Sequence, residues 1–315
     1  MDPAYEAVSK VTVPLIGQRK TGERIACLTA YDYPTARIAD EAGADVILVG
    51  DSLGQVVLGY DSTLPVTIDE VLHHLRAVRR GVRRALLVAD LPFGSYHVSG
   101  ASALAASIRL LKEGGAEAVK LEGGKKRAAR IRRLVNAEIP VMAHIGLTPQ
   151  SIRAIGGPKV RGKTAESAAE ILEDAQAVEG AGAFAVVLEG IPRELAAIVT
   201  RRLRIPTIGI GAGPECDGQI LVIHDLLGLS PEPRPKFVRV YTRVAEAARG
   251  AITSYCDDVR QGRFPADTES YHWTASVKDE FERESNAPVP GANVAAGLSR
   301  QPKNGGVKLP LRARN

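Results

Sequence analysis

Eight short apolar runs recur along this chain, and polar stretches with helical periodicity separate them. The runs, rich in Val, Leu, Ile and Ala, occupy residues 25–30, 45–50, 85–90, 117–122, 140–145, 184–189, 206–211 and 219–225. Near-continuous apolar runs are typical of parallel strands that are buried on both faces. Strands that alternate with helices form βαβ units. Eight such units favour closure into a (β/α)8 barrel, the TIM-barrel class of α/β fold, over an open doubly wound sheet.

The stretches between the runs support this interpretation. They are rich in Ala, Leu, Glu and Arg, and the clearest of them lie at residues 34–43, 67–81, 101–115 and 166–182. Several end in Gly, which is common just after a helix. No G-x-G-x-x-G motif follows the first run, which weighs against a dinucleotide-binding fold.

A chain of 315 residues accommodates one barrel of about 250 residues and an extension. After the eighth run comes a Pro-rich break at 230–237, and then a helical segment at 235–264 that we expect to pack on the barrel. Beyond residue 272 the chain is rich in Pro, Gly, Asn and Ala without an apolar period, a composition typical of disorder. We therefore predict a catalytic barrel domain with a C-terminal helical extension at 1–272, and a low-complexity basic tail at 273–315.

The charge and the cysteines argue against several classes of partner and site. Three of the five net positive charges lie in the stretch 273–315, so the basic balance is poor evidence for nucleic-acid binding. Cys27, Cys216 and Cys256 show neither metal-site spacing nor a paired framework. The first twenty residues lack the apolar core of a signal peptide, and no window approaches about 20 apolar residues. We expect a cytoplasmic protein with no nucleic-acid partner and no membrane association.

Five of the runs end on, or just before, a titratable residue. These residues are Asp51, Asp90, Glu122, His144 and Glu189. In a barrel they would converge at the carboxyl ends of the strands, where barrel enzymes place their active sites. The pattern therefore predicts an enzyme.

Asp51, Asp90 and Glu122 follow three neighbouring strands. Three clustered carboxylates would repel each other unless a cation offset their charge. Oxygen-only ligands favour Mg²⁺ or a similar hard ion. The alternative is that the acids form salt bridges with barrel-top Lys or Arg residues, of which Lys120 is the obvious candidate.

Three further residues complete the candidate site. Lys120 lies two residues before Glu122, so both side chains point to the same face of their strand. It could hold an anionic substrate group or neutralise the acids. Glu189 lies across the barrel from the acid cluster and is a candidate general base. For His144, a hydrogen-bonding or gating role and a satisfied structural role both stay open.

Read together, several motifs closely resemble the ketopantoate hydroxymethyltransferase family. They are LTAYDYPTARIADEAG, ILVGDSLGQVVLGYDSTLPVT, VADLPFGSY, GGAEAVKLEGG, PVMAHIGLTPQS, GAFAVVLEGIP and IGIGAGPECDGQILVIHDLLGL, and they span about residues 10–270. The departures from the family pattern lie in GGPKVRG at 156–162, in LHHL at 72–75 and at Gly190. These positions are where we expect contacts with the folate and with the mouth of the barrel.

The resemblance implies a (β/α)8 barrel and a reaction. The family transfers a hydroxymethyl group from 5,10-methylenetetrahydrofolate to 3-methyl-2-oxobutanoate (2-oxoisovalerate) and forms ketopantoate for pantothenate and coenzyme A synthesis. It also implies a homo-oligomer, a decamer or a similar ring.

The family's functional residues carry over onto matching positions. Asp51 and Asp90 match direct Mg²⁺ ligands, and Glu122 completes the metal site, in part through water. Ser52 and Lys120, with Asp51 and Asp90, match residues that hold the 2-oxo acid. Glu189 matches the base that removes the C3 proton of the Mg²⁺-bound 2-oxo acid to form the enolate.

Two other functions stay open at this point. One is a Mg²⁺-dependent C–C bond enzyme of the phosphoenolpyruvate mutase and isocitrate lyase kind, in which the lyases use a loop Cys as acid. The other is a catalytically silent barrel, which predicts the loss of at least one of the matched residues.

Overall fold

The computed structural model describes residues 9–231 and 233–285, and its central feature is a closed sheet of eight parallel strands. The strands are β1 (Ile25–Thr29), β2 (Val46–Val49), β3 (Leu86–Asp90), β4 (Ala118–Glu122), β5 (Val141–Gly146), β6 (Ala185–Glu189), β7 (Thr207–Ile210) and β8 (Gly218–Leu221). They pair in chain order, and β8 closes onto β1. The predicted (β/α)8 barrel is confirmed.

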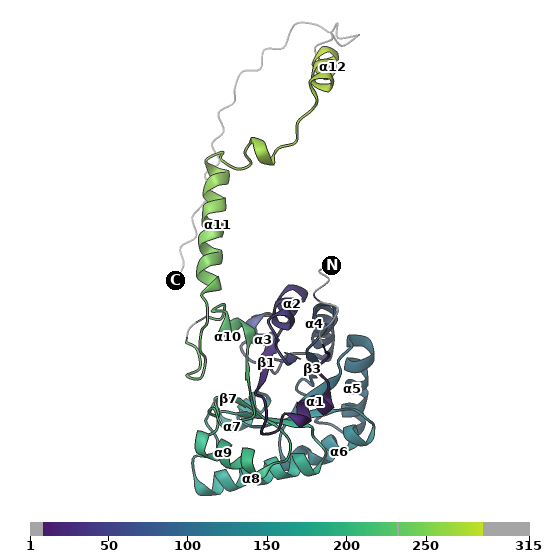
Figure 1. The fold of residues 1–315 in the computed structure, drawn as a ribbon, viewed down its shortest axis with the longest axis vertical. Helices are drawn as coiled ribbons and strands as arrows, with labels where there is room; N and C mark the ends of the chain where they lie inside the picture. The colour runs from purple at the N-terminus through teal and green to yellow at the C-terminus, as the bar shows by residue number, and fades with distance from the viewer. Residues whose placement is uncertain (1–8, 232, 286–315) are drawn as a thin grey trace, which may run out of the picture. The chain divides into compact units, whose positions relative to one another are not determined.

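Helices follow the strands and surround them (Figure 1). The longer ones are α2 (Tyr33–Glu41), α4 (Ile68–Gly81), α5 (Gly100–Gly114), α6 (Ala128–Asn136), α8 (Ala165–Gly180) and α9 (Arg193–Arg202). Shorter elements are α1 (Val13–Gln18), α3 (Leu53–Val56), η2 (Lys125–Arg127), η3 (Pro149–Ser151), α7 (Ile152–Ile155) and α10 (Ile223–Leu226). The C-terminal part contains α11 (Val244–Arg260), η4 (Asp267–Glu269) and α12 (Ala275–Ser285).

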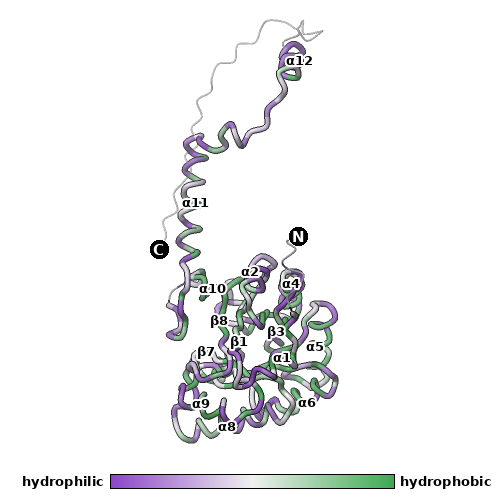
Figure 2. Tube along the Cα trace, viewed as in Figure 1, coloured by the Kyte–Doolittle hydropathy of each residue, from purple (hydrophilic) through white to green (hydrophobic). Residues whose placement is uncertain are grey.

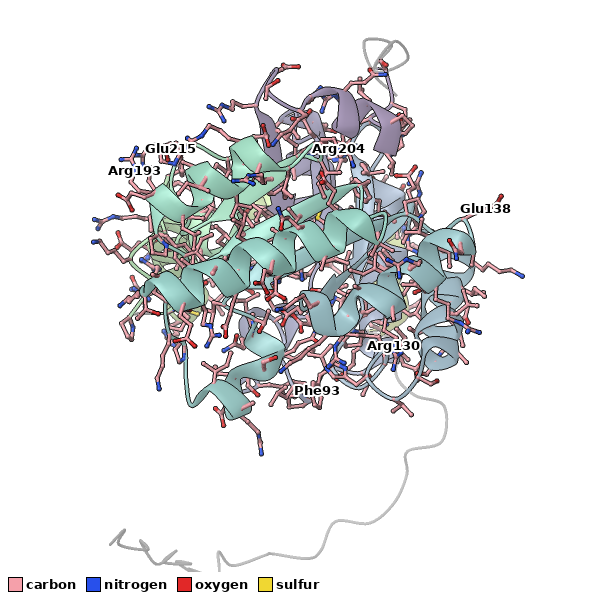
Figure 3. The ribbon with its side chains drawn as sticks, turned by 90° about the horizontal axis from the view of Figure 1, so that it is seen from below. Phe93, Arg130, Glu138, Arg193, Arg204 and Glu215 are labelled. Carbon is pink, nitrogen blue, oxygen red and sulfur yellow. The ribbon has the colours of Figure 1, made fainter. Side chains whose placement is uncertain are left out.

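Local sequence signals define the ends of these helices. Thr67 and Glu70 form a capping box at the start of α4, in which each side chain accepts a hydrogen bond from the other residue's backbone N–H. Gly115, with φ of 76°, ends α5 in the left-handed conformation that glycine adopts readily. Apolar and polar residues alternate along the barrel helices (Figure 2), and charged side chains project from their outer surface (Figure 3). The apolar faces thus pack on the outside of the strands.

The barrel interior is filled by side chains of alternate strand residues, as the pleat requires. The apolar interior cluster includes Ile25, Cys27, Val46, Leu48, Leu86, Val88, Ala118, Met142, Ala185, Val187, Ile208 and Ile220. Val11 and Ile16 belong to the same cluster, so α1 and the segment that leads into it close the amino-terminal end of the barrel. The interior is therefore solid below the level of the predicted site.

Asp217 anchors the amino-terminal end of the barrel. Its carboxylate accepts hydrogen bonds from Lys20 Nζ at 2.8 Å, from the Thr21 N–H at 3.0 Å and from the Thr207 N–H at 2.8 Å. Burial alone would raise the pKa of Asp217, but the hydrogen bonds, that of Lys20 first, outweigh it and lower the pKa. The ionised form of Asp217 therefore stabilises the fold.

This linkage predicts how the barrel responds to acid. Because the pKa of Asp217 is lower in the folded state, its contribution is present above the unfolded value of about 3.9 and is lost as the pH falls through the folded value. Asp217→Asn should lower the free energy of unfolding at pH 7 by about 1–3 kcal/mol, the usual cost of a lost charged hydrogen bond. It should also lose less stability than wild type between pH 5 and pH 3. Thermal melts across this range test this, with the exposed acid variant Glu194→Gln as control. If Asp217→Asn and Glu194→Gln lost the same amount of stability between pH 5 and pH 3, the assignment to Asp217 would be wrong.

The structure corrects the predicted course of the last strand. The apolar run 219–225 was expected to be one strand, but β8 ends at Leu221 and Ile223–Leu226 form α10. The Ile223 N–H donates a hydrogen bond to Thr29 Oγ1 on β1, which helps to hold the chain as it turns out of the barrel. A short apolar run fits a strand and a buried helix equally well, so its sequence does not reveal this turn.

The chain forms two compact units, residues 1–250 and 251–315. The predicted helical segment 235–264 contains α11, which is shorter than expected, and its packing on the barrel stays a prediction. Residues 275–285 of the expected irregular tail form α12, and the ring of Phe281 in this helix lies 5.0 Å from the ring of Trp273, which precedes the helix. Residues 286–315 lie outside the described residues, and the domain boundary at 272 stays a prediction.

None of the helices described is both long and apolar enough to cross a membrane.

Candidate active site at the carboxyl end of the barrel

The interior rows of side chains change from apolar to titratable at the carboxyl ends of the strands. In β4 the inward row runs Ala118, Lys120, Glu122, and in β6 it ends at Glu189. Register brings neighbours together, since Asp90 pairs with Lys120 and Glu122 pairs with His144 across adjacent strands. The same alternation that builds the core therefore delivers the polar layer above it.

Asp51 and Ser52 follow β2 in the turn that leads into α3. The Asp51 N–H donates to Asp90 Oδ2 at 3.3 Å, which ties this turn to β3. Ser52 Oγ lies 2.7 Å from the hydroxyl of the buried Tyr31. The turn is thus held from two sides, and both of its polar side chains line the central cavity.

Lys120 is buried and pairs with Asp90. Its Nζ lies 3.0 Å from Oδ1 and 2.9 Å from Oδ2 of that carboxylate. Burial alone would lower the pKa of Lys120, but Asp90, and then Glu122 and Asp51, outweigh burial and raise it. The ammonium is therefore charged at neutral pH, and the salt bridge considered from the sequence is present.

One ammonium does not offset the whole acid cluster. Burial, and then the charges of Asp90 and Glu122, raise the pKa of Asp51. Burial also raises the pKa of Asp90 against the opposing effect of Lys120. With Glu189 and His144 included, the predicted site residues that line the cavity carry four carboxyl groups and two basic groups, so the acidic groups outnumber the basic ones by two. Such an excess is what a divalent cation offsets.

His144 lies between two carboxylates. Its Nδ1 is 3.4 Å from Glu122 Oε1, and its Nε2 is 3.3 Å from Glu189 Oε2. Burial and Lys120 lower the pKa of His144, but Glu122 and Glu189 outweigh them and raise it to about 9. Burial alone would raise the pKa of Glu122, but His144 and Lys120 outweigh it and lower that pKa. The imidazole connects the acid cluster to Glu189, a contact that the sequence did not show.

Glycine at position 146 makes room for Glu189. Gly146 ends β5 with φ of 96°, and the Leu147 N–H donates to the Glu189 carbonyl oxygen at 2.8 Å. A Cβ atom at this position would lie 2.3 Å from that carbonyl oxygen. Only glycine therefore lets the two strands end side by side here.

The site residues predicted from sequence all line one cavity of about 200 Å³. They are Asp51, Ser52, Asp90, Lys120, Glu122, His144 and Glu189. Within the described residues, no group of three His, Cys, Asp or Glu side chains is arranged as a metal centre, since Asp90 is turned to Lys120 and Asp51 to Gln150. The donors are hard oxygens with an excess of negative charge, and in that respect they fit Mg²⁺.

Sequence reasoning missed Tyr31, Tyr96 and Gln150, which are buried polar side chains that contact the predicted residues. Gln150 lies in the motif PVMAHIGLTPQS, which was used only for its resemblance. A polar residue just after a predicted barrel strand was the one signal that could have drawn attention to it.

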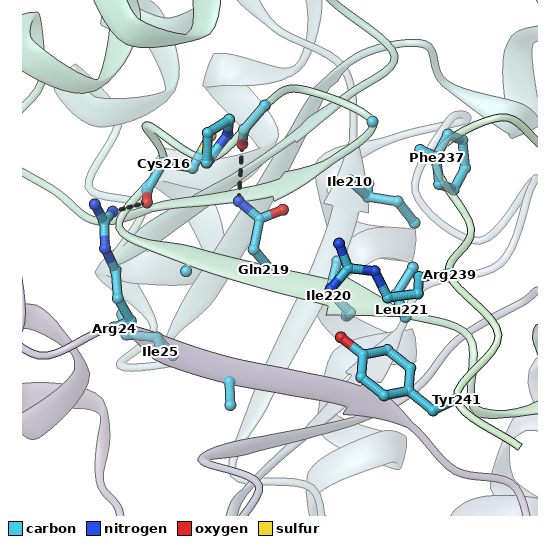
Figure 4. Close-up of a pocket in the computed structure, with 15 residues that line it drawn as sticks. Arg24, Ile25, Ile210, Cys216, Gln219, Ile220, Leu221, Phe237, Arg239 and Tyr241 are labelled. Atoms are coloured by element: carbon cyan, nitrogen blue, oxygen red, sulfur yellow. Dashed lines mark hydrogen bonds between the residues drawn. The ribbon is translucent and has the colours of Figure 1, made fainter. Parts of the chain in front are cut away.

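A larger cavity of about 690 Å³ lies near β1, β7 and β8, beside the segment that carries Phe237, Arg239 and Tyr241 (Figure 4). Gln219 donates to the Gly213 carbonyl oxygen there at 2.9 Å, and Arg24 bonds to the Cys216 carbonyl oxygen. Its lining contains no group of carboxylates, so it is not the candidate active site.

Comparison with protein families agrees with the resemblance seen in the motifs. Residues 10–267 match the model of the family described as ketopantoate hydroxymethyltransferase. The chain belongs to this family. The matched range contains all seven site residues predicted from the sequence.

Individual relatives agree with this assignment. The chain is 56% identical over 279 residues to a 3-methyl-2-oxobutanoate hydroxymethyltransferase of Koribacter versatilis (strain Ellin345), with 88% of this chain and 95% of that protein covered. It is 54% identical over 275 residues to the enzyme of that name from Carboxydothermus hydrogenoformans (strain ATCC BAA-161 / DSM 6008 / Z-2901), covering 87% and 100%.

Solved structures share the fold at low identity. A phosphonopyruvate hydrolase in complex with oxalate and Mg²⁺ aligns with a TM-score of 0.53 at 16% identity, covering 88% of this chain and 97% of that one. A 2,3-dimethylmalate lyase of the phosphoenolpyruvate mutase and isocitrate lyase superfamily aligns with a TM-score of 0.52 at 17% identity, covering 87% and 98%. At this identity the likeness concerns the barrel fold alone.

Proposed function

We propose that this protein transfers a hydroxymethyl group from 5,10-methylenetetrahydrofolate to 3-methyl-2-oxobutanoate and forms ketopantoate. One water supplies the oxygen of the new hydroxyl group, and tetrahydrofolate is released. One observation carries the proposal. In a chain of this family, three buried carboxylates and a charged lysine lie in the same cavity as Glu189, a carboxylate that can act as a base.

The metal would be Mg²⁺, held by Asp51 and Asp90 directly and by Glu122 in part through water. When bound there, Mg²⁺ supplies Lewis-acid polarisation of the ketone of the 2-oxo acid, which makes the C3 proton more acidic. The support is the oxygen-only donor set and its excess negative charge. The Asp51 backbone N–H donates to Asp90 Oδ2, so the turn that carries Asp51 lies against the Asp90 carboxylate.

Lys120 and Ser52 would bind the carboxylate of the 2-oxo acid. The Lys120 ammonium stays charged because three carboxylates surround it, and it lines the cavity beside Asp90. The Ser52 hydroxyl lies 2.7 Å from the Tyr31 hydroxyl and lines the same cavity. An anionic substrate would thus meet one charged donor and one neutral donor.

Glu189 would remove the C3 proton. Its side chain is 15% exposed and lines the cavity, and Oε2 lies beside His144. Because His144 lies beside Oε2, Oε1 is the oxygen that would accept the proton. The resulting enolate carbon would attack the one-carbon unit of the folate.

The competing functions have less support. Cys27 and Cys216 are buried, Cys256 lies in α11, and none of them lines the cavity, so the loop Cys of the related lyases has no counterpart among the described residues. A silent barrel predicts the loss of a matched residue, whereas Asp51, Asp90, Lys120, Glu122 and Glu189 are all present and line one cavity.

Product formation tests the reaction directly. Purified protein with Mg²⁺, 3-methyl-2-oxobutanoate and methylenetetrahydrofolate should form ketopantoate, measured by mass spectrometry. Omitting the folate or chelating the metal should each abolish product. Ketopantoate formation that persists in excess chelator would contradict the Mg²⁺ requirement, and no product under any condition would contradict the function.

We also propose that the protein is a homo-oligomer, with a decamer expected from the family. Exposed apolar side chains along α11 support association, since Ile252, Tyr255 and Val259 are 62%, 55% and 46% exposed. A cytoplasmic location and the absence of nucleic-acid and membrane partners are kept as part of this proposal.

A further inference from the structure

Gln150 contacts two of the proposed metal-binding carboxylates at once. It lies in η3 after β5 and is 3% exposed. Its side-chain Nε2 donates to Asp51 Oδ2 at 2.9 Å, and its backbone N–H donates to Glu122 Oε2 at 3.0 Å. One residue therefore holds an oxygen of each carboxylate, although 99 positions separate it from Asp51.

Hydrogen bonding allows only one orientation of the Gln150 amide. Nε2 donates to Asp51 Oδ2 and to the Leu91 carbonyl oxygen at 3.0 Å, and both of these partners are acceptors. On the other side, Oε1 accepts a hydrogen bond from the Tyr96 hydroxyl at 2.7 Å. A flipped amide would place its oxygen against two acceptors, Asp51 Oδ2 and the Leu91 carbonyl oxygen.

Tyr96 is itself held in place. Its ring is 1% exposed, and its hydroxyl oxygen accepts a hydrogen bond from the Glu122 N–H at 3.3 Å. Two acceptors lie within reach of the hydroxyl proton, and Gln150 Oε1 at 2.7 Å is closer than the Glu122 carbonyl oxygen at 3.3 Å. The Glu122 N–H thus donates to Tyr96, and the Tyr96 hydroxyl donates to the Gln150 side chain. Gln150 in turn donates from its backbone N–H to the Glu122 carboxylate and from its side chain to Asp51.

A neutral donor suits this position. A Lys or Arg at position 150 would pair with the Asp51 carboxylate and so compete with a metal ion for it. An acidic residue there would repel the Asp51 carboxylate. The amide fixes one oxygen of Asp51 and one of Glu122 without changing the charge of either group. The second oxygen of Asp51 accepts no hydrogen bond among the described residues, and Asp51 lines the cavity.

We propose that Gln150, oriented by Tyr96, is a positioning residue that holds Asp51 and Glu122 ready to bind a divalent cation. The inference rests on the proposed function, in which these acids bind Mg²⁺. Partners of this kind typically change metal affinity or activity by about 10–100-fold when they are removed.

The test measures binding of Mn²⁺ alone, followed by its electron paramagnetic resonance signal, with no substrate present. Gln150→Met keeps the length of the side chain but removes its amide, and should weaken Mn²⁺ binding about 10–100-fold. Tyr96→Phe keeps the ring but releases the amide, and should weaken binding less, by about 3–10-fold. Tyr96→Phe should have no further effect on Mn²⁺ binding when combined with Gln150→Met, because Tyr96 acts through the amide.

Controls separate positioning from general stability. Gln219→Met removes an amide from the cavity outside the barrel and should leave Mn²⁺ binding unchanged (Figure 4). If Gln150→Met fails to fold, Tyr96→Phe alone still tests the idea. Mn²⁺ affinities of both variants within twofold of wild type would overturn the inference while the proposed function stands. Absence of Mn²⁺ binding by wild type would overturn the proposed metal site as well, so the two failures are distinguishable.

Discussion

Replacing Glu189 by glutamine should slow the exchange of the C3 hydrogen of 3-methyl-2-oxobutanoate with deuterated water by about 10²–10⁴-fold, the usual contribution of a positioned general base. The substitution keeps the size of the side chain but removes its capacity to accept the proton. Exchange needs no folate, so it isolates proton removal from one-carbon transfer. Binding of Mg²⁺ and of the 2-oxo acid should stay close to wild type, because Glu189 contacts His144 rather than the acid cluster.

Proton NMR in deuterated water follows the exchange directly. Glu194→Gln, an exposed acid in the helix that follows the same strand, is the matched control and should exchange at the wild-type rate. Suppose instead that Glu189→Gln exchanges as fast as wild type yet forms no ketopantoate. Glu189 would then act in one-carbon transfer, and its assignment as the C3 base would be wrong.

Asp51→Asn should abolish turnover and remove the Mg²⁺ dependence of 2-oxo acid binding. Asparagine keeps one oxygen but loses the charge that Mg²⁺ requires, so metal affinity should fall by more than about 100-fold, beyond the loss typical of indirect contacts. Asp51 is a cleaner test than Asp90, whose loss would also leave the buried Lys120 without its partner. Glu122→Gln should be milder if its contact with the metal runs through water.

Calorimetric titration of 3-methyl-2-oxobutanoate, with and without Mg²⁺, measures this effect. Asp217→Asn is the control, because it removes a buried acid at the opposite end of the barrel and should keep metal-dependent binding. If Asp51→Asn bound the 2-oxo acid with the same Mg²⁺ dependence as wild type, Asp51 would not be a ligand. The salt bridge between Lys120 and Asp90 would then be the main role of the acid cluster.

Much of the fold and most of the candidate site were predictable because both follow from periodicity. Strand residues alternate between the two faces of the sheet, so Lys120 and Glu122 had to share a face once β4 was recognised. Parallel strands in a barrel end on one side, so Asp90, His144 and Glu189 had to converge. The turn after Leu221 was not predictable, since an apolar run carries no signal that distinguishes a strand from a short buried helix.

The sequence by itself therefore determined the barrel, the residue types at its carboxyl end and the family to which the chain belongs. The tertiary structure decided which of those residues touch. It placed His144 between Glu122 and Glu189, paired Lys120 with Asp90, and set the Gln150 amide against Asp51 from 99 positions away. The reason is physical. Strand periodicity is a local property that residues two apart reveal, whereas a hydrogen bond depends on distances of a few tenths of an ångström between segments that only the closed barrel brings together.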